Sequence, residues 1–242
     1  MRLSILGSGS AFSGYGGDAC AVLDERVMVD VGSAPHVLLP RLGLRIHDIE
    51  LVLLTHVHLD HSGMLPLLLG ALAYDAEPPP PGRLTISGPV GTRELVHRLV
   101  VAGFGSTTER RITKLVAPEY VVLQDGSDVK IGGSRVRSHA VVHSTGPSLA
   151  YSVTRDKLRV GFSGDTTLCA GLRRLAGEVD VLVCECSGLD GPVAGGHLWR
   201  GEVAKLIGEY PGVRFILNHL PGRSEVPGAL IAHDLLTLEL TA

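Results

Sequence analysis

The sequence predicts an α/β protein in which two mixed β-sheets are flanked by helices on their outer faces. Short β segments and helical segments alternate along the 242 residues, a length within the usual range for one α/β domain. Each half of the chain runs through strands, then a polar loop, then a helix. We therefore expect residues 1–242 to form a single domain, with no linker beyond the proline run of residues 78–81.

In the first half, strands are expected where short apolar runs are bounded by turn residues, and helices where apolar residues recur at a helical period. The expected strands are residues 3–6, 19–24, 27–30, 49–55 and 84–87. The expected helices are residues 35–42, 64–74 and 93–102. Residues 103–113 are polar and glycine-containing, so we expect an exposed loop there.

The second half is expected to be rich in strands, because turn signals such as Asp125-Gly126 and Gly132-Gly133 separate its apolar runs. The expected strands are residues 120–123, 128–131, 134–140, 148–153, 158–162, 180–185 and 214–217. The expected helices are residues 170–176, 202–209 and 230–238.

Composition excludes several classes of protein. Hydrophobic residues make up 45% of the chain and charged residues 19%, which disfavours disorder. The net charge of −3 gives no electrostatic footprint for long nucleic acid. The longest apolar stretch, residues 64–74, contains Pro66 and Gly70 and is too short to span a bilayer. We expect a soluble, cytoplasmic protein, because the N-terminus also lacks a convincing secretory signal.

Two of the four cysteines, Cys184 and Cys186, are two residues apart in an apolar run. On a strand they would point to the same face, which makes them poor disulfide partners. We expect them to be buried as small hydrophobic residues, which suits a reducing compartment.

The strongest chemical signal is the segment 56–61, HVHLDH, which follows the apolar run of residues 49–55. It places His56, His58, Asp60 and His61 within six residues. Imidazole and carboxylate groups are ligands suited to zinc, manganese or iron. A solvated turn has no need of three histidines beside one acid, so we interpret the segment as a metal site.

Three further ligand-type residues each follow an expected strand. His143 lies in VVHSTG, Asp165 lies in SGDT, and His219 follows RFILN. Loops at strand ends are where α/β folds place their functional residues. We therefore expect these three side chains to join His56, His58, Asp60 and His61 as metal ligands.

This order of motifs resembles the metallo-β-lactamase superfamily over nearly the whole chain. The resemblance implies the αββα sandwich of that superfamily and two divalent metal ions, zinc by preference, with manganese or iron as alternatives. It implies one metal bound by His56, His58 and His143, a second bound by Asp60, His61 and His219, and Asp165 bridging both. Such a pair activates a bridging water and polarises the substrate oxygen. Asp60 is also a candidate for accepting the proton of that water.

Within the superfamily, the chain is most similar to the ribonuclease Z-like phosphodiesterases. HSGMLPLLL after the metal motif, DVLVCECS, and GGHLWRGEVAKL each resemble segments of that group. The resemblance gives His197 contact with the phosphate or leaving oxygen and makes Glu185 the acid that orients it. For Asp30 two readings stay open, a bond to a ligand histidine and the capping of a turn.

Two departures bear on the substrate. Leu198-Trp199 follow His197 where the group has Ser-Thr, and only 22 positions separate His143 from Asp165, which leaves no room for a tRNA-holding arm. The expected activity is therefore hydrolysis of a small phosphodiester, such as a cyclic nucleotide or a short oligonucleotide. Long nucleic acid and membrane are not expected partners, and a homodimer is left open.

The sequence is also compatible with two alternatives. One is a hydrolase of a carboxylic ester, lactone, thioester or β-lactam, which would use the same metals but would not need a proton donor at His197. The other is a non-catalytic binding protein with the same fold, which the loss of a ligand would favour; none of the seven is lost.

Overall fold

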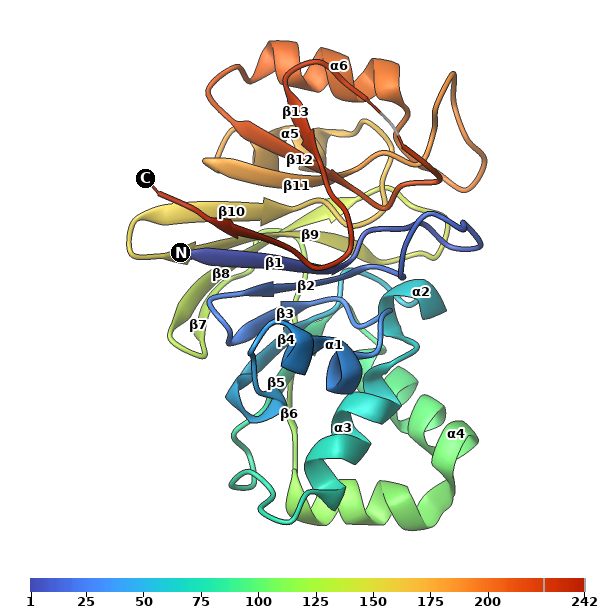
Figure 1. Cartoon of the computed structure of the whole chain (residues 1–242), viewed down its shortest axis with the longest axis vertical. Coiled ribbons are helices and arrows are strands. Elements are labelled where there is room, and N and C mark those ends of the chain that lie inside the picture. Colours follow the sequence, from blue (N-terminus) through green and yellow to red (C-terminus); the bar gives the residue numbers. More distant parts are fainter. Residues whose placement is uncertain (224, 242) are drawn as a thin grey trace.

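Two seven-stranded β-sheets pack face to face, and helices cover the outer face of each (Figure 1). This computed structural model describes residues 1–223 and 225–241. The N-terminal helices lie below the sandwich in Figure 1 and the C-terminal helices lie above it. The four-layer αββα arrangement predicted from the sequence is confirmed.

The first sheet has the strand order β14-β1-β2-β3-β4-β5-β6. β1 pairs antiparallel with β14 and β2, whereas β3 to β6 run parallel. Its strands are β1 (Arg2–Gly7), β2 (Cys20–Leu23), β3 (Val27–Val29), β4 (Leu51–Leu53), β5 (Thr85–Gly88), β6 (Glu119–Val122) and β14 (Leu236–Glu239). The helices of this half are α1 (Pro35–Arg41), the 3-10 turn η1 (Ile46–Asp48), α2 (Leu59–Ser62), α3 (Leu65–Tyr74) and α4 (Thr92–Leu115).

The second sheet has the order β13-β12-β11-β10-β9-β8-β7. Strands β7 to β10 form an antiparallel meander, and β10 to β13 run parallel. Its strands are β7 (Asp128–Ile131), β8 (Ser134–Val141), β9 (Ser148–Arg155), β10 (Leu158–Phe162), β11 (Val181–Glu185), β12 (Arg214–Asn218) and β13 (Ala229–Ile231). The helices are α5 (Ala170–Ala176) and α6 (Arg200–Glu209).

Alternation along the strands divides the apolar side chains among three clusters. On β4, Leu51 and Leu53 face the core between the sheets, while Val52 faces the layer of α3 and α4. On β12, Ile216 faces the central core, while Phe215 packs in the outer cluster with α5 and α6. Because successive strand residues point to opposite faces, each buried strand contributes to two layers and holds them together.

Most expected elements are present within a few residues of their expected bounds, but two expectations were wrong. Residues 103–113 are not a loop, because α4 continues through them after a kink at Gly105, whose φ is 77°. Ile112 is buried on the inner side of that helix, and Arg111 donates from Nε to the carbonyl of Ala73 at 2.8 Å. Packing against α3 therefore stabilises a segment that looks polar in sequence.

The second error is the helix expected at residues 230–238, which is instead β13 and β14. Leu236 and Leu238 pack against the central core and Leu240 lies within it, a spacing of two that belongs to a strand. Leu235 has a φ of 62°, which breaks any helix at the turn between the two strands. β14 then returns beside β1 and closes the first sheet.

Cys184 and Cys186 are both buried in the outer cluster beneath α5 and α6, which confirms the expectation that they pack as small hydrophobic residues. Among the helices of the described residues, none combines the length and the apolar character that crossing a membrane requires.

Candidate metal centre

All seven expected metal ligands converge at one edge of the sandwich, where strands end. His56 and His58 follow β4, and Asp60 and His61 lie in the single turn of α2. The other three follow strands of the second sheet: His143 follows β8, Asp165 follows β10 and His219 follows β12. The site thus lies across the two sheets and draws on both halves of the chain.

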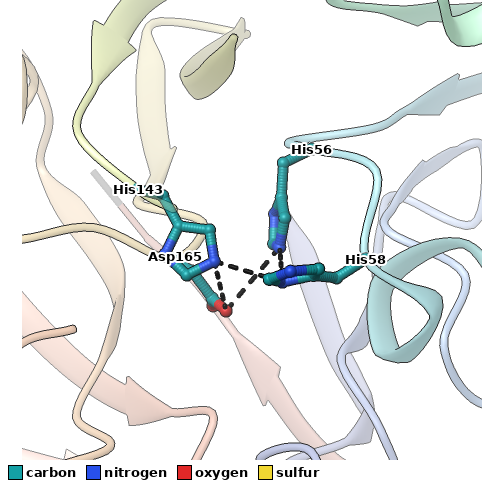
Figure 2. A group of neighbouring side chains, drawn as sticks. All are labelled: His56, His58, His143 and Asp165. Atoms are coloured by element: carbon teal, nitrogen blue, oxygen red, sulfur yellow. Dashed lines mark hydrogen bonds and ion pairs between the residues drawn. The ribbon is translucent and has the colours of Figure 1, made fainter. Parts of the chain in front are cut away.

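Four of these side chains form a first group (Figure 2): His56, His58, His143 and Asp165. Nδ1 of His58 lies 3.2 Å from Nε2 of His56 and 3.2 Å from Nε2 of His143. Oδ2 of Asp165 lies 3.7 Å from Nε2 of His56 and 3.8 Å from Nε2 of His143. Three imidazole nitrogens and one carboxylate oxygen therefore surround a common point.

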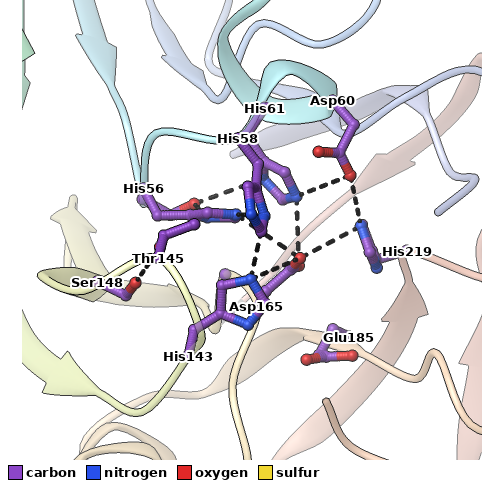
Figure 3. Close-up of polar contacts among 12 residues, drawn as sticks. His56, His58, Asp60, His61, His143, Thr145, Ser148, Asp165, Glu185 and His219 are labelled. Carbon is purple, nitrogen blue, oxygen red and sulfur yellow. Dashed lines mark hydrogen bonds and ion pairs between the residues drawn. The ribbon is translucent and has the colours of Figure 1, made fainter. Parts of the chain in front are cut away.

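A second group consists of Asp60, His61, Asp165 and His219 (Figure 3). Oδ2 of Asp60 lies 3.1 Å from Nε2 of His219 and 3.6 Å from Nε2 of His61. Asp165 places Oδ1 3.3 Å from Nε2 of His61 and Oδ2 3.4 Å from Nε2 of His219. Asp165 belongs to both groups, so its carboxylate is the one side chain that the two share.

The outer ring nitrogens of His56 and His61 are held by a buried pair, Thr55 and Asp30. Oδ2 of Asp30 lies 2.7 Å from Nδ1 of His61, and Asp30 also accepts hydrogen bonds from the amide and hydroxyl of Thr55. The Thr55 hydroxyl oxygen lies 3.0 Å from Nδ1 of His56. When each Nδ1 donates its proton outward, each Nε2 keeps its lone pair for the centre. Of the two readings of Asp30, the bond to a ligand histidine is the one present.

His143 and His219 are oriented in the same way by the other sheet. Nδ1 of His143 donates to the carbonyl oxygen of Gly196 at 3.2 Å. Nδ1 of His219 lies 2.8 Å from Oγ of Ser187, whose hydroxyl in turn donates to Oε2 of Glu185 at 2.7 Å. These bonds leave Nε2 of each ring directed into the centre.

Close backbone approach is what allows the loops to meet. A Cβ on Gly32 would lie 1.8 Å from the carbonyl oxygen of Asp60, so only glycine lets the loop after β3 pass beneath α2. His219 itself has a left-handed φ of 54°, a conformation that costs conformational energy in a histidine. Such strain is characteristic of functional sites, where the surrounding structure maintains it.

The acidic side chains at the centre favour a positive charge between them. Burial lowers the pKa of His56 to about 2, so this ring is neutral and able to coordinate. Burial alone would raise the pKa of Asp60, but the hydrogen bond from His219 and the nearness of His61 lower it to about 2. Burial would lower the pKa of His61, yet the carboxylates of Asp165 and Asp30 raise it well above its usual value. The ionised acids thus stabilise positive charge at this point.

The donor set fits one or two metal ions. Nε2 of His61 and Oδ1 of Asp165 are buried, and neither has a hydrogen-bond partner among the described residues. Ligand atoms that share a tetrahedral ion at about 2.0–2.1 Å lie about 3.3 Å from one another, which matches the nitrogen spacings of the first group. Nitrogen and carboxylate donors suit zinc, manganese or iron.

His197 and Glu185 form a pair beside the metal ligands. Nδ1 of His197 lies 3.2 Å from Oε1 of Glu185 and 3.8 Å from Oδ2 of Asp165. Its ring also stacks on His219 with centroids 5.5 Å apart. Burial would lower the pKa of His197, but the hydrogen bond and charge of Glu185 raise it.

Glu185, His197 and His219 also form a third group of possible metal donors. The Glu185 carboxylate, however, already accepts from the amide of Thr166 at 2.7 Å and from the hydroxyl of Ser187 at 2.7 Å. We therefore interpret Glu185 as an acid that orients its neighbours.

Sequence reasoning did not single out Thr55, Ser187 or Asp18. Thr55 precedes the metal motif and Ser187 follows Glu185 by two residues, so adjacency was the available signal. Asp18 lies beside the second group, where burial and the charge of Asp60 raise its pKa. No motif marks it, since its position depends on the long loop between β1 and β2.

Comparison with known proteins agrees with this architecture. A family model described as anti-Pycsar protein Apyc1 matches residues 1–194. A UPF0173 protein of Pyrococcus furiosus is 29% identical over 174 residues, which cover 71% of this chain and 68% of that protein. A ribonuclease Z of Bradyrhizobium diazoefficiens is 22% identical over 254 residues, with 83% and 82% covered. The chain spans from 41% to 82% of the length of three such curated relatives.

Two solved structures share the fold. Human tRNase Z, short form, superposes with a TM-score of 0.79 at 24% identity and covers 100% of each chain. The metallo-β-lactamase fold protein YhfI from Bacillus subtilis gives a TM-score of 0.75 at 17% identity, with 98% of each chain covered. The metallo-β-lactamase fold expected from the motifs is thereby confirmed.

Proposed function

The chain belongs to the anti-Pycsar protein Apyc1 family, and we propose that it is a dinuclear-metal hydrolase of small phosphodiesters, of the cyclic nucleotide or short oligonucleotide type. Its sequence relatives include ribonuclease Z, in keeping with the resemblance found in its motifs. The observation that carries the proposal is the Glu185–His197 pair, which lies beside the two groups of possible metal donors that share Asp165 and belongs to neither.

In this proposal His56, His58 and His143 hold one divalent ion, Asp60, His61 and His219 hold the other, and Asp165 contacts both. Zinc suits the histidine-rich set best, with manganese or iron as alternatives. When bound, such ions supply an activated water and neutralise charge on the phosphate oxygens. The pKa of Asp60 is lowered to about 2, so it is ionised and suited to hold a cation. Its second carboxylate oxygen is the candidate acceptor for the proton of the water.

Protonation of the leaving oxygen by His197 is the step that a phosphodiester needs and an acyl substrate does not. Nδ1 of His197 is hydrogen-bonded to Glu185. In the protonated ring, Nε2 of His197 therefore carries the proton that can pass to the leaving oxygen. The raised pKa of His197 favours the protonated ring that a proton donor requires. The leaving alkoxide of a ribose hydroxyl needs such a proton, whereas acyl transfer with a good leaving group does not.

The short connection between His143 and Asp165 supports a small substrate. β9 and β10 occupy most of the chain between these residues, so no arm extends from this part of the sandwich. The net charge of −3 also disfavours a surface that tracks many phosphates. We therefore propose that pre-tRNA is a poor substrate.

The test is a substrate screen of the metal-loaded protein. It compares a cyclic mononucleotide, bis-p-nitrophenyl phosphate, pre-tRNA, a lactone and a β-lactam. We expect turnover of the first two, its loss in His56→Ala, and its retention in the matched control His36→Ala, which alters an exposed helical histidine. Hydrolysis of the lactone or β-lactam with no phosphodiester turnover would overturn the proposal, and efficient trimming of pre-tRNA would overturn the small-substrate part.

A further inference from the structure

Five large apolar side chains are exposed on segments that carry or adjoin the candidate metal ligands and His197, and together they are called the apolar rim. They are Phe12, Leu59, Val142, Leu189 and Val193. Leu59 lies between two ligands in sequence, and Val142 directly precedes His143. Val193 pairs with His197 in an isolated bridge. Exposed apolar groups gathered around a polar centre indicate a substrate with an apolar part attached to a charged one.

Phe12 is the most exposed member of the apolar rim and is fixed beside His219. Its side chain has a relative exposure of 108%, the highest among the exposed large hydrophobic residues. The flanking residues Ser10 and Ser13 both donate to the carbonyl oxygen of Leu220, at 3.0 Å and 3.2 Å. Leu220 directly follows His219, so the turn that presents Phe12 is attached to the segment bearing a metal ligand.

The conformation of Phe12 is strained, and the loop around it maintains that strain. The amide of Ser13 donates to the carbonyl of Ser10 at 3.1 Å, which closes a turn in which Phe12 has a φ of 61°. Glycine is the residue usually found at such a position. The base of the loop is held by Asp234, which accepts from the amides of Ser8 and Gly17 at 2.9 Å and 2.8 Å.

An aromatic ring that gains no packing in the folded chain, at a strained position on a well-anchored turn, is explained by recognition of a partner. The loop between β1 and β2 and helix α2 lie at the same right-hand edge of the sandwich in Figure 1. Because this turn is bonded to the segment that bears His219, we take the partner to be a flat, apolar part of a substrate held at the metal centre.

We propose that Phe12 stacks on the base of a cyclic mononucleotide whose phosphate lies at the metal centre. The proposal rests on the proposed function and adds the residue that reads the nucleoside. Aromatic rings bind bases of any sequence because every base has a π-face, and removing one such ring weakens binding by about 5- to 150-fold. Phe12 would act on binding of substrate and transition state alike, so it should affect KM more than kcat.

The test compares Phe12→Ala and Phe12→Trp with the matched control Phe104→Ala, which alters another exposed phenylalanine on α4. Substrates are a 3′,5′-cyclic mononucleotide and trimethylene phosphate, a six-membered cyclic phosphodiester without ribose or base. For Phe12→Ala we expect the nucleotide KM to rise about 5- to 150-fold with kcat within about twofold, and turnover of trimethylene phosphate to stay unchanged. Phe12→Trp should restore the KM, and Phe104→Ala should match the wild type.

A second readout is independent of catalysis. Stacking should quench the fluorescence of etheno-AMP on binding to the wild type and to Phe104→Ala, but much less with Phe12→Ala. An unchanged KM and unchanged quenching in Phe12→Ala would overturn the proposal, as would equal losses on both substrates. So would self-association of the wild type that Phe12→Ala abolishes without a change in KM. If the wild type cleaves no phosphodiester, the proposed function fails, whereas loss of quenching in Phe12→Ala would still support stacking.

Discussion

Nδ1 of His197 lies 3.2 Å from Oε1 of Glu185, and the other carboxylate oxygen of Glu185 accepts from Ser187, whose hydroxyl also meets His219. One buried carboxylate thus orients both a proposed metal ligand and a proposed proton donor. The hydrogen bonds of Glu185 link the metal centre to the chemistry of the leaving group.

The first prediction separates these two roles of the pair. His197→Ala should leave the metals bound, because His197 is outside the two main donor sets. If it donates a proton to the leaving oxygen, its loss should lower kcat/KM about 10²- to 10⁴-fold for an ester with a ribose hydroxyl as leaving group. The loss should be smaller for p-nitrophenolate, which leaves without protonation.

The measurement is kcat/KM for both kinds of ester in wild type and variant, with metal content determined in each. Glu185→Gln serves as a companion, because it keeps the shape but removes the charge that favours the protonated ring. An equal and slight loss of kcat/KM for both esters would mean that His197 has no role in catalysis. Acyl hydrolysis would then be the better-supported hypothesis.

The second prediction concerns Asp165. Wild-type protein reconstituted with zinc should hold about two metal ions per chain, and Asp165→Ala should lose both together. The carboxylate contacts both donor groups, so its removal would leave two cations close together with less screening. Asp75→Ala, at a half-exposed acid remote in sequence from the ligands, is the matched control. Elemental analysis after dialysis decides: two tightly held ions in Asp165→Ala would show that Asp165 is not the bridge.

The metal ligands could be predicted from the sequence because ligand-type residues are either clustered in one segment or placed directly after an expected strand. His56, His58, Asp60 and His61 fall in one short segment, and His143, Asp165 and His219 each follow a strand. The strands themselves are apolar runs bounded by turns, which is why most were expected within a few residues. The sequence does not predict which of these loops lie next to one another in the folded chain.

The missed features depend on contacts between distant segments. Residues 103–113 are helical because Ile112 is buried against the first half of the domain, although Ser106 and Glu109 have the spacing of a capping box. The segment of β14 forms a strand because β1, at the other end of the chain, is its antiparallel partner. The only sequence signal for it is the alternation from Leu236 to Leu240. Thr55 and Ser187 orient ligands through single hydrogen bonds, which no periodicity encodes.

The third prediction concerns Thr55, whose hydroxyl lies between Asp30 and Nδ1 of His56. Thr55→Val keeps the shape but removes this hydroxyl, so His56 should lose its fixed tautomer and ring orientation. Losing such an outer partner typically weakens metal binding about 10- to 100-fold. Competition titration with a chelator measures the affinity. Thr55→Ser, which keeps the hydroxyl, should stay within a few-fold of the wild type, and equal affinities in Thr55→Val and wild type would contradict the assigned role.

The last prediction concerns pH and His139, a histidine of β8 that is outside the donor groups. His139 is buried, and burial lowers its pKa, while Glu178 opposes this with Oε2 3.4 Å from Nε2. The positive groups of Arg174 and Arg137 lower the pKa further, and Asp125 raises it. In the unfolded chain the pKa of a histidine is about 6.5.

As the pH falls below about 6.5, the unfolded chain therefore takes up a proton that the folded chain does not, so folding stability decreases. The decrease ends once the pH has passed the lowered folded-state pKa. His139→Gln cannot titrate, so its free energy of unfolding should fall less steeply between pH 7 and 5. The difference in slope is at most about 1.4 kcal/mol per pH unit, the value for one proton.

Urea unfolding of the chelator-treated protein at several pH values measures these slopes. The other histidines are the same in both proteins and cancel in the comparison. Parallel curves for wild type and His139→Gln would show that His139 takes up its proton equally in the folded and unfolded chain, so burial in β8 would not be what sets its charge.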